Sequence, residues 1–214
     1  MRLESSIICS VAAATLVGCA TGMTEDECAS ADWQTLGERD GSYGETLDRF
    51  DERSAHCAKF EIIADLEAYK LGRDRGLETY CTPQSGYDTG RRGDIYQYAC
   101  PQSSEPAFLA EYEIGRQLYI LTKDYDDAVA AYENAIKSIA SNRYDLQHAR
   151  DRYHENSLSE QDRATVRDEM RGHRRELEQL ENDLPLLEVE IDRARDRLDD
   201  YRASLKRQGR KAID

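Results

Sequence analysis

Residues with the greatest potential for chemistry lie between positions 69 and 100, where glycine, arginine, aromatic residues and cysteine recur in two successive runs. The first run is Gly72, Arg73, Gly76, Tyr80 and Cys81, and the second is Gly90, Arg91, Gly93, Tyr96 or Tyr98, and Cys100. Arginine binds carboxylates and phosphates through paired N–H donors, and tyrosine offers an apolar ring with a polar hydroxyl. Such side chains predict a surface for a glycan or an anionic ligand, made of Arg73, Tyr80, Tyr87, Arg91 and Tyr96.

A purely structural role is the alternative for the same residues. The arginines have acidic neighbours, Asp74, Asp88 and Asp94, with which they could form internal ion pairs. The tyrosines could fill a small core, because half-buried phenols can reach water or backbone with their hydroxyls. Gly72 and Gly76 would share one face of a helix and let another backbone approach closely. We favour this packing role over a phosphate-binding loop, because no Gly-Lys-Ser/Thr sequence follows them.

The sequence offers no convincing catalytic constellation. Asp48, Asp51 and Glu52 would form one acidic helix face, which could supply the carboxylates of a glycoside hydrolase. A solvated helix face explains them equally well. His56 precedes Cys57, but a disulfide-bonded cysteine has no thiolate to offer. We therefore expect no enzymatic activity, no cofactor and no metal.

The N-terminal residues 1–18 have the features of a lipoprotein signal peptide. Their apolar run, residues 7–17, is too short to span a bilayer as a helix. The run ends in Leu-Val-Gly-Cys at Cys19, which resembles the lipobox of bacterial lipoproteins. That resemblance implies acylation of Cys19, and Ala20 in place of Asp after it implies the outer membrane, facing the periplasm. Residues 19–27 would form a linker; an ordinary secretory signal or an uncleaved core helix is the alternative.

Four cysteines remain after Cys9 and Cys19 are assigned to the signal peptide and the lipid: Cys28, Cys57, Cys81 and Cys100. An even number in an oxidising compartment predicts disulfides, for which three pairings are possible. We favour pairs of sequence neighbours, since these close the shortest loops, and each bond would add roughly 3 kcal/mol. A tetrathiolate zinc site is the alternative, although no Cys-x-x-Cys spacing supports it.

Helices must position these residues, because the apolar spacing over 28–120 is mostly helical. It predicts short helices near residues 30–36, 43–57 and 61–79, the first ending at Gly37. Residues 94–99 fit either a helix or a short strand.

The same region carries three glycine-and-aromatic tracts: Tyr69-x-x-Gly72-Arg73-x-x-Gly76-Leu77-x-x-Tyr80-Cys81-Thr82, Gly90-x-x-Gly93-x-x-Tyr96, and Phe108-Leu109-x-x-Tyr112-x-x-Gly115-Arg116-x-x-Tyr119. Together they resemble a bacterial lipoprotein family catalogued as domain of unknown function 2799, over about residues 28–120. The resemblance implies a periplasm-facing lipoprotein and brings no established chemistry.

Residues 104–208 predict a long antiparallel helical hairpin that shares its first helix with the preceding domain. Apolar residues alternate by three and four from Ile114 to Tyr153, and again from Val166 to Leu205, as in a coiled coil. Ser104 would cap the first helix, and Ser157 or Ser159 the second. The hairpin would be about 60 Å long at 1.5 Å per residue, and the tail, 209–214, would fray.

Folding the hairpin about residues 157–158 fixes a register. It pairs Ile139 with Leu177, Leu118 with Leu198, and Ile114 with Tyr201. It also places Asn142 opposite His173, a polar layer of the kind that fixes register. We therefore assign His173 to the seam rather than to a metal site. Pro185 should kink the second helix without ending it, since the seam continues across it.

Composition limits the function. A net charge of −14, with 34% charged and 39% hydrophobic residues, argues against nucleic-acid binding and against a single large core. We expect a mainly α protein with a small disulfide-stapled helical domain followed by the hairpin. Its expected role is that of a non-enzymatic outer-membrane lipoprotein, held to the membrane by its lipid, whose arm binds an envelope protein. Peptidoglycan or glycan binding is the alternative, and a cell-wall hydrolase is less well supported.

Overall fold

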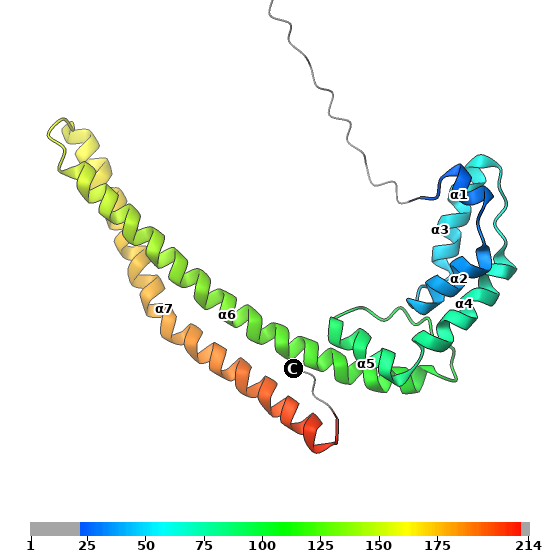
Figure 1. Ribbon diagram of the computed structural model, residues 1–214. Coiled ribbons are helices and arrows are strands. Elements are labelled where there is room, and N and C mark those ends of the chain that lie inside the picture. Colours follow the sequence, from blue (N-terminus) through cyan, green and yellow to red (C-terminus); the bar gives the residue numbers. More distant parts are fainter. Residues whose placement is uncertain (1–21, 211–214) are drawn as a thin grey trace, which may run out of the picture. The chain divides into compact units, whose positions relative to one another are not determined.

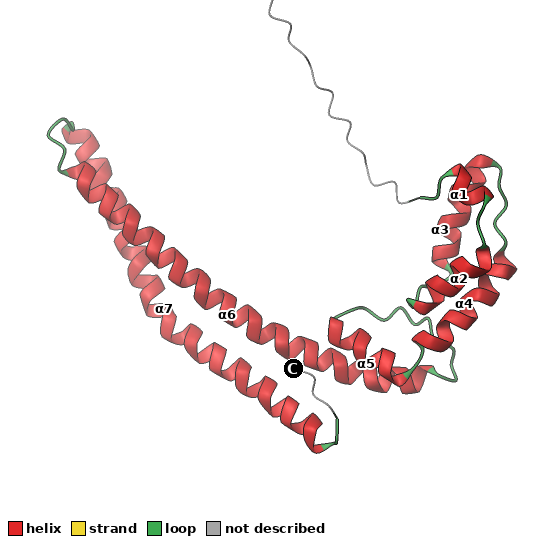
Figure 2. Ribbon diagram, viewed as in Figure 1, coloured by secondary structure: helices red, strands yellow, loops and turns green. Residues whose placement is uncertain are grey.

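The computed structural model describes residues 22–210, and this part of the chain consists of helices and loops without strands (Figures 1 and 2). The predicted mainly α fold class is confirmed. The chain folds into two compact units. The first contains the residues up to Tyr80 together with Gln97–Cys100, and the second contains Cys81–Tyr96 together with the residues from Pro101 onward. This boundary falls inside the range 28–120, which we expected to form one domain. The predicted signal peptide, Cys19 and the end of the tail lie outside the described residues.

The first unit contains α1 (Glu25–Ala29), α2 (Trp33–Ser42), α3 (Asp48–Cys57), the 3₁₀ turn η1 (Ala58–Phe60) and α4 (Leu66–Tyr80). Side-chain caps set the first two helix starts: Thr24 and Glu27 form a capping box, and Asp32 caps α2. A disulfide joins Cys28 to Cys57, with the Cα atoms 5.5 Å apart, and so ties α1 to the end of α3. The core around this bond consists of Cys28, Trp33, Phe50, Cys57 and Tyr69.

Helices α2 and α4 cross at glycines with their backbones in contact. A Cβ atom added to Gly41 would lie 2.2 Å from the carbonyl oxygen of Arg73, and one added to Gly72 would lie 1.9 Å from that of Gln34. Gly37 and Gly76 are equally close to the opposite backbone. Helix α2 therefore continues through Gly37, where we expected it to end, because the packing partner requires glycine there.

The second unit contains α5 (Pro83–Arg92), α6 (Glu105–Tyr153) and α7 (Glu160–Arg207). Its short helix α5 crosses the start of α6 in the same manner. Added Cβ atoms would lie 2.3 Å from the Phe108 oxygen at Gly86, 2.2 Å from the Tyr112 oxygen at Gly90, and 2.1 Å from the Tyr87 oxygen at Gly115.

The two crossings are copies of one arrangement. Gly37, Gly41 and Gly44 correspond to Gly86, Gly90 and Gly93, while Tyr69, Gly76 and Tyr80 correspond to Phe108, Gly115 and Tyr119. In both copies the third glycine has a positive φ, 74° at Gly44 and 82° at Gly93, and its Cα lies against a tyrosine ring, Tyr80 or Tyr119. A repeat is therefore present, but our predicted alignment of Gly72 with Gly90 is wrong. The repeating element is a pair of helices. The first helix of one pair, α2, therefore corresponds to the first helix of the other, α5, and α4 corresponds to the start of α6.

Helices α6 and α7 form the predicted antiparallel hairpin. Leu118 and Leu198 pack in one cluster, and Ile139 and Leu177 in another. The Tyr201 hydroxyl donates to the Ile114 carbonyl oxygen at 3.0 Å. The predicted layer pairs are thus present.

Helix boundaries in the hairpin agree with the sequence except at one cap. Ser159 caps α7 by accepting from the Asp162 N–H, and α7 continues unbroken through Pro185. Ser104, which we expected to cap α6, makes no side-chain capping bond; its hydroxyl donates to the Pro101 carbonyl oxygen instead. No helix among residues 22–210 is both long and apolar enough to cross a membrane.

The crossing predicts opposite effects for alanine at two helical glycines. Gly41→Ala should lower the free energy of unfolding by about 2–4 kcal/mol, because the methyl group meets backbone that cannot rotate away. Gly172→Ala should raise it by about 1 kcal/mol, since nothing lies within 4 Å of an added Cβ and alanine is the better helix former. Urea unfolding with the disulfides intact measures both, and equal effects would contradict the proposed contact.

Candidate functional site

A buried ionic network is the most elaborate polar feature of the first unit. Asp40 lies between Gly37 and Gly41, on the face of α2 that meets α4, and its side chain is almost completely buried. Arg53 of α3 binds it twice, from Nε to Oδ2 at 3.0 Å and from Nη2 to Oδ1 at 2.9 Å. The fully buried Tyr69 donates its hydroxyl to Oδ2 at 2.9 Å. The network therefore links α2, α3 and α4 through one carboxylate.

Electrostatics suit this network to holding helices together. Burial raises the pKa of Tyr69 well above its ordinary value, and the hydrogen bond to Asp40 raises it further. The phenol consequently stays neutral and keeps its proton for Asp40. The buried Asp40 carboxylate thus accepts two hydrogen bonds from the guanidinium group of Arg53 and one from the phenol of Tyr69, which compensates for the loss of its water contacts.

A cavity of about 320 Å³ lies beside the network, between α1 and α2. Its apolar lining comes from Met23, Ala31 and Leu36, and its cationic lining from Arg39 and Arg53. The carboxylates that line it are occupied in helix caps. Glu27 accepts from the Thr24 backbone and Asp32 from that of Thr35, which lowers the pKa of each. The two hydroxyl groups of the lining also bond within the helices: Ser30 donates to the Asp26 carbonyl oxygen and Thr35 to the Asp32 carboxylate.

The second unit repeats the crossing without the charge. Thr89 takes the place of Asp40 and Phe108 the place of Tyr69, and both are buried. The connection that follows the first helix is held in both units. Arg73 Nε donates to the Glu45 carbonyl oxygen at 2.8 Å in one, and Tyr112 donates its hydroxyl to that of Asp94 at 3.0 Å in the other. The Asp40 network is accordingly a feature of the first unit and is not needed for the crossing itself.

The predicted glycan or anion surface is not formed as a stacking platform. Tyr80, Tyr87 and Tyr96 are all buried. Tyr87 packs against hairpin leucines, and its hydroxyl has no hydrogen-bond partner among the described residues. Tyr96 packs on Phe108 with the ring centroids 4.7 Å apart and donates to Glu105.

The two predicted arginines of that surface lie in different units. Arg73 belongs to the first unit, where it binds the Glu45 carbonyl oxygen, and Arg91 belongs to the second. The packing alternative therefore describes the tyrosines better, because all three are buried and the Tyr80 ring lies against the backbone of Gly44.

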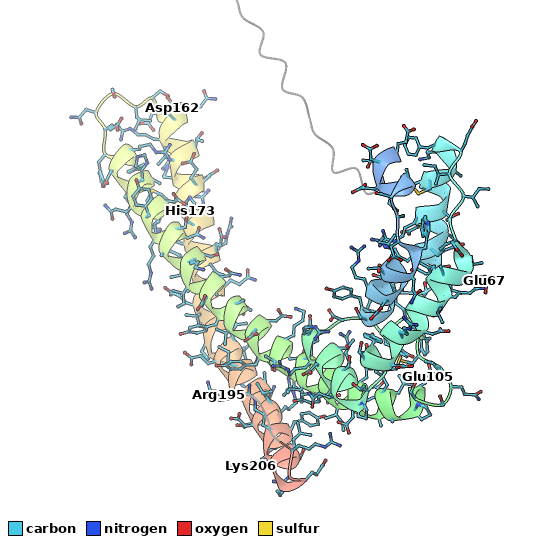
Figure 3. The ribbon with its side chains drawn as sticks, turned by 45° about the vertical axis from the view of Figure 1, so that its right-hand side comes forward. Glu67, Glu105, Asp162, His173, Arg195 and Lys206 are labelled. Carbon is cyan, nitrogen blue, oxygen red and sulfur yellow. A yellow bond between two sulfur atoms is a disulfide. The ribbon has the colours of Figure 1, made fainter. Side chains whose placement is uncertain are left out.

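The other predicted site residues agree more closely with the structure. His173 lies on α7 (Figure 3). Its Nδ1 is 2.8 Å from Asn142 Oδ1 across the hairpin, so Asn142 accepts a hydrogen bond from the imidazole. Cys28 and Cys57 form the favoured disulfide, and Cys81 and Cys100 are also disulfide-bonded, which replaces the zinc alternative. Within residues 22–210, no group of His, Cys, Asp and Glu is placed to hold a metal.

The acidic face proposed for a hydrolase is solvated. Asp48, Asp51 and Glu52 are exposed; Asp48 accepts from the Thr46 hydroxyl, and Glu52 pairs with Arg49.

Sequence reasoning missed Asp40, Arg53 and Tyr69 as a group. A signal was present: an aspartate placed between glycines at helical spacing shares the face that the glycines bring against another backbone.

Comparison with known proteins finds a family model that matches part of the chain. Residues 32–117 match the family model described as Protein of unknown function (DUF2799). The matched range contains both glycine crossings and ends early in α6, so most of the hairpin lies outside it. No curated protein and no solved structure shows significant similarity to the chain.

The Asp40 network predicts an alkaline weakness. Because the folded-state pKa of Tyr69 is raised, the unfolded chain loses this proton first, above about pH 10. Below that pH, Tyr69 makes its full contribution to the free energy of unfolding. As the pH rises further, this contribution should fall by about 1.4 kcal/mol per pH unit. Tyr69→Phe should make the decline between pH 9 and pH 11 less steep in urea unfolding, whereas Tyr43→Phe, on an exposed tyrosine, should leave it unchanged.

Proposed function

We propose that this chain, matched over residues 32–117 by the DUF2799 family, is a non-enzymatic lipoprotein of the outer membrane whose hairpin binds a protein partner. The anchor is supported by the Leu-Val-Gly-Cys sequence that ends at Cys19. The disulfide between Cys28 and Cys57 fits an oxidising compartment such as the periplasm.

The observation that carries the binding role is an apolar patch on α7 outside the hairpin seam. Leu186 is 66% exposed and Val189 is 44% exposed, and they lie three residues apart beside the exposed Pro185. The seam positions around them, Leu184 and Leu187, face α6 as the heptad spacing requires. The patch therefore adds nothing to the hairpin and is available to another molecule.

The patch is surrounded by negative charge. Between residues 176 and 192 α7 has no basic residue, and its acids are Glu176, Glu178, Glu181, Asp183, Glu188, Glu190 and Asp192. The α6 segment 124–136 that packs opposite also has acids without bases: Asp124, Asp126, Asp127 and Glu133. We name this part of the hairpin, residues 124–136 and 176–192, the acidic belt.

Apolar side chains within an acidic surface favour a cationic amphipathic partner. Such a segment would place its apolar face on Leu186 and Val189 and its Lys or Arg side chains against the acidic belt. Opposite charge would speed the encounter, and the apolar contact would slow dissociation. Six acids of the belt already pair with a base at its edges: Asp124, Asp127, Glu133, Glu181, Glu190 and Asp192. Among the described residues, Asp126, Glu176, Glu178, Asp183 and Glu188 have no basic partner, and Glu188, next to the apolar patch, accepts only from the Tyr132 hydroxyl.

The anchor is tested by Cys19→Ala. The unchanged chain, expressed with its signal sequence in a bacterium that processes lipoproteins, should fractionate with outer membranes and carry the mass of the lipid on Cys19. Cys19→Ala should not be acylated and should leave the membrane fraction. Acylation elsewhere, or none, would contradict the anchor.

Binding is tested by a photoreactive amino acid at position 186 and, as the control, at position 120. Ile120 is also apolar and outside the seam; it lies before the acidic belt, one helical turn from Arg116 and Lys123 as well as from Asp124, the first residue of the belt. In intact envelopes, position 186 should give a discrete adduct that Glu188→Lys with Glu190→Lys weakens at least about tenfold, because the substitutions reverse the local charge. Equal capture at both positions would contradict the proposal, and an adduct of twice the chain mass would identify a second copy instead.

A further inference from the structure

The loop after α3 exposes apolar side chains that the first unit does not use. Ile63 is 93% exposed, and Phe60 and Leu66 are also exposed. In contrast with the α7 patch, these residues lie on the small N-terminal unit, close to where its chain begins.

Backbone geometry holds Ile63 outward. Glu61 has a positive φ of 60°, and the Ile62 N–H bonds the Cys57 carbonyl oxygen at 3.2 Å, which ends the helix with a reversal of direction. The chain then passes into an irregular stretch in which Ile62 and Ala64 pack against the core cluster and Ile63, between them, points away. Its exposure is therefore fixed by the two inward neighbours.

A cavity of about 380 Å³ lies beside the exposed residues. Its lining is mainly apolar, with Ser54 and Glu61 as polar members; the apolar members are Phe50, Ala58, Ile62, Ile63, Ala64 and Leu66. The surface beside the loop therefore has an apolar recess.

The start of the described chain lies at the same end of the unit. A Cβ atom built on Gly22 would be 2.0 Å from Cε1 of His56, so the Gly22 backbone lies against that imidazole, one residue before Cys57 and the loop. Gly22 follows Cys19 by three residues, a reach of at most about 11 Å. The disulfide between Cys28 and Cys57 keeps the two segments together.

We propose that residues 58–66 insert their apolar side chains into the lipid interface of the membrane that holds Cys19. This inference rests on the proposed lipid anchor, which brings the loop within reach of the acyl chains. Glu61 and Asp65 outnumber Lys59 in the loop, so attraction to anionic headgroups does not drive the contact. Ile63 and Phe60 enter the interface and the lipid fills the recess, while the charged residues remain among the headgroups.

A tryptophan at position 63 tests the contact. The acylated chain carrying Ile63→Trp is placed in phosphatidylcholine vesicles with and without brominated acyl chains, and the single natural tryptophan, the buried Trp33, is subtracted with the unchanged chain. The matched control is Tyr43→Trp, at a 73% exposed site of the same unit at the far end of α2. The Ile63→Trp emission should shift to the blue and fall at least about twofold with brominated lipid, since an interfacial indole lies near the acyl chains. The control should show neither change.

The possible results separate the two proposals. An acylated, vesicle-bound Ile63→Trp chain with unshifted and unquenched emission would overturn the inserted loop and leave the anchor intact. A blue shift without quenching would mean that a protein surface covers the loop, which also overturns it. Absence of lipid on Cys19 by intact mass would overturn the anchor and this inference together.

Discussion

Both units of this protein depend on one constraint, the direct contact of two helix backbones at glycine. At Gly41 and Gly90 the facing carbonyl oxygens occupy the space that any side chain would need. The contact allows Cα–H···O interactions and places neighbouring side chains deep in the interface. In the first unit it buries Asp40, which then requires Arg53 and Tyr69. In the second it buries Thr89 and Phe108, which require no ionic partner. One backbone arrangement thus supports a charged interior in one unit and a largely apolar one in the other.

The sequence predicted the hairpin in detail because each helix carries its own evidence. Heptad spacing identifies the seam, and once the turn near residue 157 is placed, every layer follows, including Asn142 opposite His173. The glycine repeat could not be aligned in the same way. Its equivalent residues are separated by different intervals in the first and second helices of each pair, because the connections between them differ in length. A linear reading therefore matched Gly72 of a second helix with Gly90 of a first helix.

The candidate site residues also divide into those that local sequence spacing identifies and those that depend on three-dimensional packing. The disulfide between Cys28 and Cys57 followed from the preference for short loops. Tyr80, Tyr87 and Tyr96 were misjudged because tyrosine serves equally in cores and on binding surfaces, and only three-dimensional packing separates the two uses. Arg53 could not be joined to Asp40 from sequence, because the bond depends on how α3 packs beside α2. The exposure of Ile63 was equally hidden, since it depends on the inward packing of Ile62 and Ala64 on either side.

Helix α6 has a mechanical consequence of its own. It is a single helix from the crossing at Gly115 to its end at Tyr153, and no break in it separates the two regions. Over those residues it extends about 57 Å at 1.5 Å per residue. A force applied near the tip of the hairpin therefore acts on the contact between α5 and α6 through a lever arm. A displacement of the tip by a few ångströms would move α6 relative to Gly86 and Gly90 of α5 by only a fraction of an ångström. Two helices whose backbones touch directly have no side chains between them that could adjust to such a movement. The contact would therefore either resist the movement or break as a whole, so that α5 separates from α6.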